Sequence, residues 1–283
     1  MPQWLVEVEQ TADEEKTRLV TKPFAYVFYV TNDAYACAAL HAMHTLRTKL
    51  QMDVARIDFV VLYSDELSDN ILQRMQSVVM ARTILVERIL ADVADPTWQA
   101  SLTKLRAFEE WGYQRVVFLD SDAVPLQNLD HLFELPRATL YAPTAYWLAQ
   151  PFFTTTLMVI EPSNQRFREI IQWAAERGES AGHDMDVLNA MFKHEVQYLA
   201  ADYTVLNSDF RARPEAKNQL YPTTLELRRR AKFVHFSCGP DGEYGKPWTA
   251  QGYDMSLLLR DGIDPFFGEL FEDYWRSVER LCM

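Results

Sequence analysis

The 283-residue sequence has no long hydrophobic run that could span a membrane. Its apolar stretches, such as residues 24–30, are far shorter than the ~20 residues that a membrane-spanning helix needs. The N-terminus, MPQWLVEVEQTADEEK, lacks the basic region and the apolar core of a signal peptide. We therefore expect no membrane partner and no secretory leader.

Cysteine is scarce, and the three cysteines, Cys37, Cys238 and Cys282, form no CxxC motif. Their odd number and their spacing argue against a zinc knuckle and against a disulfide framework, and they indicate a reducing compartment. The sequence therefore predicts a cytoplasmic protein without disulfides.

Basic charge is also in short supply, because 40 acidic residues outweigh 28 basic ones and give a formal net charge of −12. This balance excludes nucleic acid as a main partner, since phosphate backbones are bound by basic surfaces. A small nucleotide stays open as a ligand, because a bound cation can neutralise a diphosphate locally. The absence of a P-loop counts against a metal-dependent nucleotidyltransferase.

No proline-, glycine- or serine-rich linker, no repeat and no low-complexity tract divides the chain. Hydrophobic residues make up 48% of it and aromatic residues 13%, which is enough for a large core. We predict a polar N-terminal arm over residues 1–23 and a single domain over residues 24–283.

The first half alternates between strand-like and helix-like segments. Strands are predicted over residues 24–30, 57–62, 83–86 and 115–119, and helices after residues 31–33 and over residues 68–80 and 96–111, the last capped by Asp95. This alternation predicts a mainly parallel α/β sheet with ligands beyond the carboxyl ends of its strands.

The second half of the sequence is more mixed. Strands are predicted over residues 139–142, 157–160 and 233–235, helices over residues 164–177 and 184–193, and irregular structure over residues 207–230. The irregular segment is polar, and we interpret it as part of an acceptor-binding side.

The strongest local motif is FLDSDAVP, residues 118–125, in which Asp120 and Asp122 directly follow a buried strand. If the backbone stays extended, both carboxylates point the same way, because side chains alternate along a strand. Two oxygen ligands at a strand end suit Mg²⁺ or Mn²⁺, with substrate phosphates completing the shell. A solvated turn would have the same sequence, so the motif alone leaves both readings open.

Other residues could complete such a site. His235 is a suitable third ligand for Mn²⁺, and Lys246 could offset negative charge on a departing phosphate. Lys104 could contact a phosphate or a carboxylate, while Asp184 and Asp186 precede or begin a helix. Each also has an ordinary structural explanation: a core histidine, solvated lysines, and acids that favour a helix N-terminus.

Six segments in a fixed order point to a family: TNDAYACAALHAMHTL (31–46), LTKLRAFEEW (102–111), VFLDSDAVPLQNLDHLF (117–133), EPS (161–163), HDMDVLN (183–189) and VHF…GKPW (234–248). Together they resemble glycosyltransferase family 8, and specifically its glycogenin branch, over most of the chain. The resemblance implies a GT-A fold, which is a mainly parallel, Rossmann-like sheet flanked by helices with an acceptor-side region. It also implies a UDP-hexose donor, Mn²⁺ (or Mg²⁺) as cofactor, and retention at the anomeric carbon.

The resemblance also assigns roles to single residues. The ligands of Mn²⁺ would be Asp120, Asp122 and His235. The donor hexose would be placed by Lys104 and Asp184, of which Asp184 is also the candidate closest to a covalent nucleophile. The nucleotide and its phosphates would be held by Thr31, Asn32, Tyr35, Lys104, Ser121, Gly245 and Lys246.

Several positions depart from the family pattern. Thr154-Thr155-Thr156 stand where glycogenin-like enzymes carry Asn-Ser-Gly near the sugar, and Met185 stands where they carry Gln. Extra residues between His235 and Lys246 require that loop to bulge. These departures leave glucose and galactose both open as donor sugars, and they leave the metal-binding set intact.

We therefore predict a retaining, Mn²⁺-dependent hexosyltransferase that moves galactose or glucose from a UDP-sugar to a hydroxyl of a protein-linked glycan. Glycogenin-related galactosyltransferases of cytosolic proteins provide the precedent, and a homodimer is a family-level expectation. The alternative is a glycogenin-like, self-glucosylating primer of glucan synthesis, for which Tyr221 is poorly spaced from His235. A non-catalytic scaffold is disfavoured by the complete DSD, His and KPW elements.

Overall fold

The computed structural model describes residues 21–64, 67–90, 101–210, 220–237, 245–249 and 264–283. Strands within these residues are β1 (Phe24–Val30), β2 (Ile57–Tyr63), β3 (Arg82–Leu85), β4 (Arg115–Leu119), β5 (Ala123–Pro125), β6 (Leu140–Pro143), β7 (Leu157–Ile160), β8 (Gln197–Leu199), β9 (Val205–Leu206) and β10 (Phe233–His235). The α-helices are α3 (Asp33–His44), α4 (Asp69–Val78), α5 (Asn164–Arg177), α6 (Asp184–Phe192), α7 (Thr224–Arg230) and α9 (Pro265–Leu281). Short helical turns are η1 (Thr45–Lys49), η3 (Ser101–Phe108), η4 (Asp130–Glu134), η5 (Gly178–Ala181), η6 (Ala201–Tyr203), η7 (Asn207–Phe210) and η8 (Pro247–Thr249).

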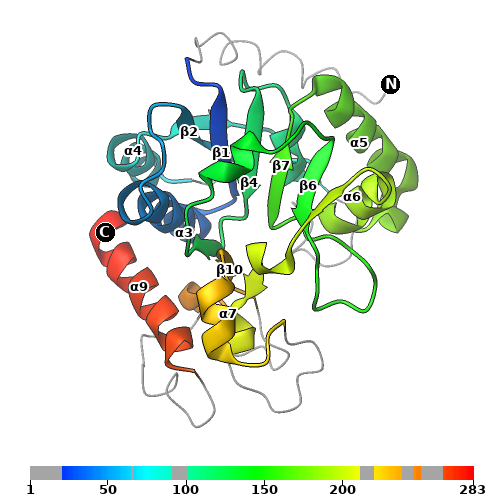
Figure 1. Ribbon diagram of the computed structural model, residues 1–283. Helices are drawn as coiled ribbons and strands as arrows, with labels where there is room; N and C mark the ends of the chain where they lie inside the picture. The colour runs from blue at the N-terminus through cyan, green and yellow to red at the C-terminus, as the bar shows by residue number, and fades with distance from the viewer. Residues whose placement is uncertain (1–20, 65–66, 91–100, 211–219, 238–244, 250–263) are drawn as a thin grey trace.

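The main sheet has the strand order β3-β2-β1-β4-β7-β6-β8 among the described residues (Figure 1). Its first four strands are parallel, and β7 runs antiparallel to both β4 and β6. The chain moves outward from β1 to β2 and β3 and then returns to add β4 on the other side of β1. The carboxyl ends of β1 and β4 therefore form a topological switch point, where ligands of such sheets bind.

The strands bury both of their faces because neighbouring side chains point to opposite sides. In β1, Val27 and Tyr29 join a core against α5 and α6, whereas Tyr26 and Phe28 join a core against α3 and α4. The continuous apolar run FAYVFYV is typical of such a doubly covered strand. The predicted mainly parallel α/β sheet is thus confirmed.

A smaller sheet, β5-β10-β9, lies beyond the carboxyl edge of the main sheet. The chain reaches it through a turn at Ser121 and Asp122, after which β5 begins at Ala123. The expectation that the backbone stays extended through the DSD motif is therefore wrong. The turn occurs because β5 leaves the main sheet and pairs antiparallel with β10, with Ala123 opposite His235.

Two of the predicted elements need correction. Residues 207–230 are not irregular throughout, since α7 begins after the N-cap Thr223, whose hydroxyl accepts a hydrogen bond from the amide of Glu226. Residues 101–108 form the 3-10 turn η3 in place of the predicted α-helix, and its proposed cap Asp95 lies outside the described residues. The other predicted strands and helices agree with the structure to within a few residues at their ends.

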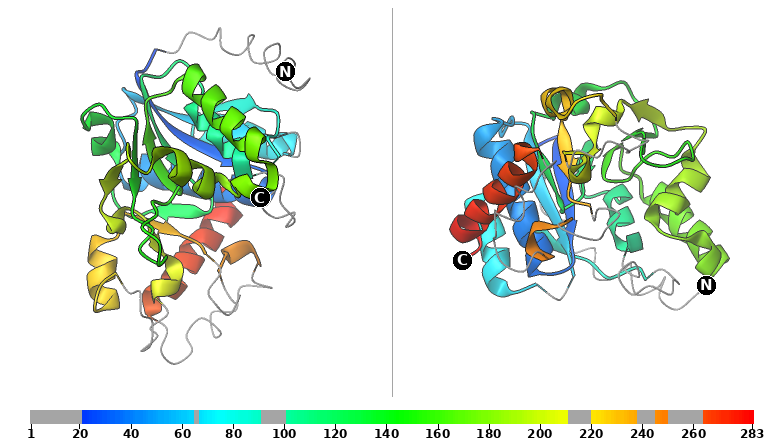
Figure 2. Two further views of the ribbon diagram at one scale, coloured as in Figure 1. Left: turned by 90° about the vertical axis from the view of Figure 1, so that its right-hand side faces the viewer. Right: turned by 90° about the horizontal axis from the view of Figure 1, so that it is seen from below.

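The C-terminal helix α9 packs on α3, as the two views of Figure 2 show. Cys37 of α3 and Cys282, directly after α9, form a disulfide with their Cα atoms 6.0 Å apart. The expected absence of disulfides is therefore wrong. The two cysteines are 245 residues apart, so only the packing of the helices brings them together. The cytoplasmic location loses its cysteine argument and stays a prediction.

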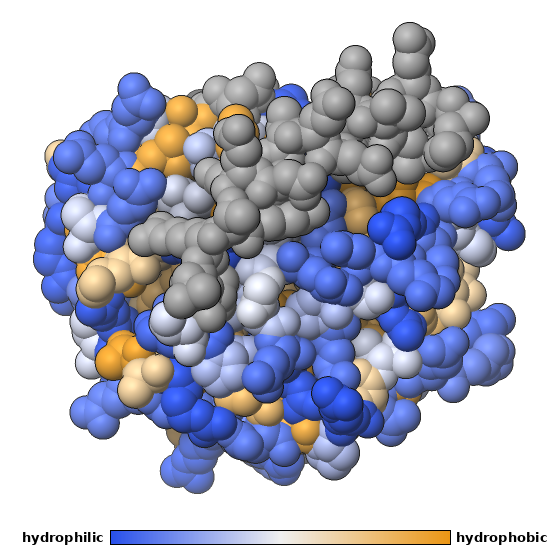
Figure 3. All heavy atoms as spheres, turned by 90° about the horizontal axis from the view of Figure 1, so that it is seen from above, coloured by the Kyte–Doolittle hydropathy of each residue, from blue (hydrophilic) through white to orange (hydrophobic). Residues whose placement is uncertain are grey.

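The opposite end of the sheet from the switch point shows mostly hydrophilic side chains with small, separate hydrophobic areas (Figure 3). Among the described residues, no helix combines the length and the apolar character that a membrane crossing requires. The homodimer stays a prediction. The division into an N-terminal arm and a single domain also stays a prediction, because residues 1–20 lie outside the described residues.

Candidate functional site

Asp120, Asp122 and His235 meet at the switch point. One ligand atom from each lies within 4.8 Å of the others, and His235 Nε2 is 3.2 Å from Asp122 Oδ1. The imidazole arrives there because the amide of Phe236 donates to the carbonyl of Asp122 at 2.8 Å, continuing the β5–β10 pairing. Two carboxylates and an imidazole form a donor set that fits Mn²⁺ or Mg²⁺.

On one side of this set lies the Lys246 cluster, which consists of Tyr35, Asp122, His235 and Lys246. The ammonium of Lys246 is 2.7 Å from Asp122 Oδ2 and 2.7 Å from the hydroxyl of Tyr35. Burial alone would lower the pKa of Lys246, but the charge of Asp122 outweighs it and raises this pKa. Lys246 is therefore a fixed positive charge beside the candidate metal ligands.

On the other side lies the Lys104 cluster, which consists of Lys104, Asp120, Thr155 and Asp184. Lys104 Nζ is 3.1 Å from Asp120 Oδ1 and 2.8 Å from Asp184 Oδ2. The hydroxyl of Thr155 donates to the same Asp184 oxygen at 2.5 Å. Asp184 is only 6% exposed. One of its oxygens therefore interacts with Lys104 and Thr155 in a place largely shielded from water, where such interactions are strong.

The two aspartates of the DSD motif differ in their charge environment. Burial raises the pKa of Asp120, and the charge of Lys104 offsets this only in part. Burial would also raise the pKa of Asp122, but His235 and Lys246 outweigh it and hold this pKa well below its ordinary value. In Lys104, the charges of Asp120 and Asp184 overcome burial and raise the pKa.

The nucleotide-binding candidates follow β1 at the same edge. Thr31 lies in the bend after the strand, and Asn32 is the N-cap of α3. The Asn32 side-chain oxygen accepts from the amides of Ala34 and Tyr35 at 3.1 and 3.2 Å. This cap fixes the first turn of α3 and thereby the position of the Tyr35 ring.

Ser121 lies between the two aspartates, and Gly245 directly precedes Lys246. Ser121 is buried in the turn between the two aspartates, at 6% exposure. The Gly245 carbonyl accepts from Asn207 Nδ2 at 2.8 Å, and Asn207 Oδ1 accepts from the amide of Ser237 at 3.0 Å. All of the predicted site residues are thus among the described residues, and they gather on this edge of the sheet.

Sequence reasoning missed Asn207, which is completely buried and ties the segment of Lys246 to the end of β10. No local motif marks it, and only its two backbone partners reveal the role. Thr155 was noted only as a departure from the family pattern near the sugar, whereas the structure shows that its hydroxyl donates to Asp184. It reaches this position because the Asp120 amide donates to the carbonyl of Thr156 at 2.8 Å.

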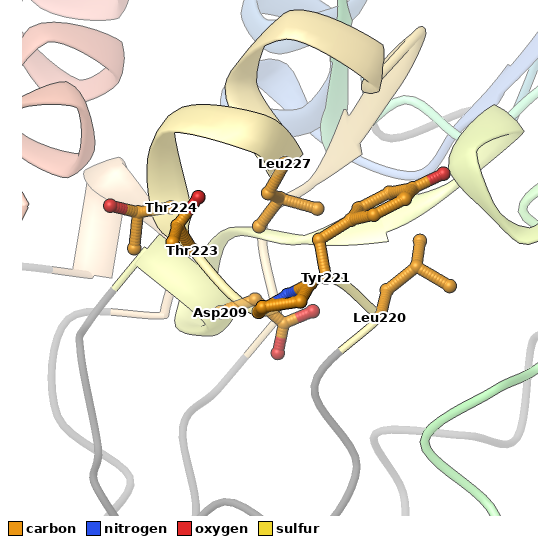
Figure 4. A pocket seen from close by; sticks show the side chains of 7 residues that line it. Asp209, Leu220, Tyr221, Thr223, Thr224 and Leu227 are labelled. Carbon is orange, nitrogen blue, oxygen red and sulfur yellow. The ribbon is translucent and has the colours of Figure 1, made fainter.

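A cavity of about 240 Å³ lies beside α7, on the side of the smaller sheet (Figure 4). It is lined by Asp209, Leu220, Tyr221, Pro222, Thr223, Thr224 and Leu227. Asp209 accepts a hydrogen bond from the hydroxyl of Tyr146, which also accepts from the amide of Leu206. Leu206 pairs with His235 in the sheet, so hydrogen bonds through Tyr146 connect Asp209 in the cavity wall to the strand beside His235.

The profile of glycosyl transferase family 8 matches residues 26–252. The chain belongs to glycosyl transferase family 8. Glucose N-acetyltransferase 1 of Gibberella zeae is 30% identical over 288 residues, which cover 92% of this chain and 62% of that protein. Glycogenin-1 of Mus musculus is 31% identical over 180 residues, or 59% of this chain and 50% of that protein. The chain thus spans less than two thirds of the length of these relatives.

Among solved structures, an active-site mutant of LgtC superimposes with a TM-score of 0.61 and 19% identity, covering 92% of this chain and 96% of that one. The family membership confirms the resemblance to family 8, including its glycogenin-like members, and the structural match confirms the GT-A fold.

Proposed function

We propose that this chain is a UDP-sugar-dependent hexosyltransferase that uses Mn²⁺ and retains the anomeric configuration. One observation carries the proposal: Asp120, Asp122 and His235 bring their ligand atoms within 4.8 Å of one another at the switch point of a family 8 fold. These ligands come from β4–β5 and from β10, which are separated by more than a hundred residues. Such convergence on one point is typical of a built site.

Asp120, Asp122 and His235 would hold Mn²⁺, with Mg²⁺ as the other cation that suits these oxygens. When bound, the ion supplies positive charge that stabilises the departing diphosphate. Lys246 would contact the same diphosphate, since its ammonium already pairs with Asp122 and its pKa is raised. Thr31, Asn32, Tyr35, Ser121 and Gly245 would line the nucleotide.

Lys104 and Asp184 would place the donor hexose. The carboxylate of Asp184 receives hydrogen bonds from Lys104 and Thr155 on one oxygen, which holds it in one orientation. A carboxylate held this way is suited to accept hydrogen bonds from sugar hydroxyls. The same bonds lower its nucleophilicity, so they favour positioning over covalent attack as the role of Asp184. The acceptor hydroxyl would then attack from the face that UDP leaves.

Galactose and glucose are the proposed donor sugars. The threonines at residues 154–156 form part of the site edge, and Thr155 is engaged with Asp184. Thr156 stands in place of the family's glycine, and its larger side chain would narrow the space beside the hexose, which makes discrimination between epimers testable. UDP-N-acetylglucosamine joins the donor panel, because the name of the Gibberella zeae relative combines glucose with an N-acetyl group.

The acceptor would be a protein-linked glycan that approaches from the side of α7. The cavity there offers a tyrosine side chain, threonine side chains and the carboxylate of Asp209, and aromatic rings and carboxylates suit saccharides. Tyr221 contributes its side chain to this cavity, and Arg230 lies 4.8 Å from the centre of its ring. Self-glucosylation stays the alternative, with Tyr221 as the acceptor to examine.

The decisive experiment incubates the purified protein with Mn²⁺ and a panel of UDP-sugars and measures free UDP and free hexose. We expect hydrolysis of one donor above the others, and loss of that hydrolysis in EDTA. Intact mass after incubation with UDP-glucose separates the alternative, because self-glucosylation adds hexose increments. Absence of hydrolysis and of UDP binding under all conditions would refute the proposed function.

A further inference from the structure

The segment that carries Lys246 is held between two helices. Trp248, two residues along, packs its ring 5.2 Å from that of Tyr35 on α3 and 5.6 Å from that of Tyr274 on α9. Lys246 itself lies 4.8 Å from the Tyr35 ring and 5.8 Å from the Trp248 ring. The position of the lysine therefore depends on how α3 and α9 are placed relative to each other.

Tyr274 connects α9 to two side chains beside the Lys246 cluster: Trp248, near Lys246, and Phe236, next to His235. It is only 2% exposed, and besides Trp248 it packs 6.3 Å from Phe236, the residue that follows His235. Phe271, one turn earlier on α9, also contacts Phe236, with ring centres 6.0 Å apart. Helix α9 thus supports the end of β10 and the lysine segment from one side.

The disulfide Cys37–Cys282 joins the same two helices covalently. Trp248 packs between Tyr35 and Tyr274. Cys37 lies two residues after Tyr35 on α3, so the crosslink is attached close in sequence to one of these two rings. The polar contacts between α9 and its neighbours include Lys49 to Asp273 at 2.6 Å and Arg74 to the carbonyl of Met283 at 2.7 Å. These exposed contacts contribute little to stability, so the end of α9 is held mainly by the disulfide and by the buried side chain of Leu281.

We propose that Tyr274 and the Cys37–Cys282 disulfide position Lys246 for the donor diphosphate, so that donor affinity depends on the oxidation state of this cysteine pair. The inference rests on the proposed function, because it names the regulation of that same site. Tyr274 is a positioning residue, since it acts through Trp248 and does not touch the donor. The disulfide sets how often the end of α9 detaches from α3.

Opening the disulfide would act by local loosening of α9. A dithiol reductant transfers two electrons and two protons, so that Cys37 and Cys282 become thiols while the reductant becomes a disulfide. Without the crosslink the end of α9 separates from α3 more often, and Trp248 then loses its ring contact with Tyr274 for part of the time. Lys246 then samples more positions, which weakens donor binding, whereas Asp120 and Asp122, at the end of β4 and in the turn before β5, remain in place.

The test compares the oxidised wild type, the dithiol-reduced wild type, and Cys37→Ser/Cys282→Ser. Calorimetry with UDP and Mn²⁺ gives the Kd, and hydrolysis of the preferred UDP-sugar gives KM and kcat. We expect Kd and KM to rise about five- to tenfold in both disulfide-free forms, while kcat changes less than about twofold. Circular dichroism checks that each form is folded at the assay temperature, and Cys238→Ser in every form removes the third thiol.

Substitutions at Tyr274 keep the inference testable if the disulfide variant is poorly folded. Tyr274→Phe keeps the ring and should retain the wild-type Kd, whereas Tyr274→Leu should raise Kd and KM to the level of the reduced protein. Arg276→Ala is the matched control, because its side chain pairs with Glu272 on the same helix. The control should leave Kd unchanged.

The outcomes separate the two proposals. Equal Kd and KM in oxidised and reduced wild type, with Tyr274→Leu also unchanged, would overturn the inference while the function stands. A fall in kcat alone would also overturn it, because it would mean that the metal ligands move with α9. If the oxidised wild type neither binds UDP nor hydrolyses any UDP-sugar, the proposed function itself fails.

Discussion

Asp120 and Asp122 are separated by one residue, yet they belong to different clusters. Asp120 faces Lys104 and Asp184, on the side where the hexose would lie. Asp122 faces His235 and Lys246, on the side of the diphosphate. Burial raises the pKa of Asp120, whereas His235 and Lys246 hold that of Asp122 low. The turn at residues 121–122 produces this difference, because an extended strand would have sent both side chains the same way.

The comparison teaches that the DSD motif is not a symmetric pair. Its first carboxylate shares Lys104 with Asp184, so one ammonium group serves two carboxylates on the sugar side. Its second carboxylate has a lowered pKa beside His235 and Lys246, so it stays ionised and can serve as a metal ligand. Substitutions in the two clusters should consequently have different kinetic signatures.

The largest effect is expected for Asp122→Ala. It removes a metal ligand and leaves Lys246 without its carboxylate partner, so UDP-sugar hydrolysis should fall by about a thousandfold or more. The measurement is initial hydrolysis rate against Mn²⁺ concentration, with EDTA as the reference state. Activity in EDTA equal to that of the wild type with Mn²⁺ would show that the metal proposal is wrong.

A smaller effect is expected for Asp184→Asn in the Lys104 cluster. The amide keeps an oxygen for Lys104 and Thr155, so the hexose should still be placed, and kcat should fall by about ten- to a hundredfold. A covalent nucleophile would behave differently, since its loss would abolish turnover altogether. Thr155→Val is the matched variant, because it removes only the hydroxyl that orients Asp184, and its loss of kcat should be smaller.

Asn207→Ala should reveal the support behind the Lys246 cluster. Its amide holds the Gly245 carbonyl and the amide of Ser237, both of which would be left unpaired in a buried place. We expect the donor KM to rise about tenfold with a lower melting temperature. Asn207→Asp, which keeps the acceptor for Ser237 but not the donor for Gly245, should show which bond matters. An unchanged KM in both variants would remove Asn207 from the support of Lys246.

The parallel half of the fold could be predicted because its signals are local. The apolar run of β1, the Asn32 cap and the carboxylates after β4 each lie within a few residues, and strand order alone brings their ends together. The acceptor side could not be predicted in the same way, since α7, α9 and the cavity depend on contacts between distant segments.

The site shows the same limit. Motifs predicted a shared site for Asp120, Asp122, His235, Lys104 and Lys246, and the structure brings these side chains together, while their roles stay predictions. The residues that hold them in place were missed, since nothing in the sequence around Asn207 or Tyr274 indicates a partner. The Cys37–Cys282 pair was missed for this reason too: its sequence separation of 245 leaves no recognisable spacing.

A partly buried carboxylate, Asp209, sharpens the comparison, because its hydrogen bond comes from the neutral hydroxyl of Tyr146. Burial raises the pKa of Asp209 to about 6 from an ordinary value of 3.8. The folded protein therefore holds a proton that the unfolded chain releases between about pH 4 and 6, so this carboxyl stabilises the fold below that window and the contribution is lost as the pH rises through it.

Asp209→Asn cannot ionise, while its amide oxygen can still accept from Tyr146. Relative to the wild type, the variant should gain stability as the pH rises from about 4 to 7, by at most roughly 3 kcal/mol for a shift of two pKa units. Urea unfolding of both proteins at several pH values across this range measures the difference. Tyr146→Phe removes the hydrogen bond that favours the ionised carboxylate and should steepen the pH dependence. A pH-independent difference between Asp209→Asn and the wild type would mean that Asp209 titrates alike in the folded and unfolded states, and that burial does not raise its pKa.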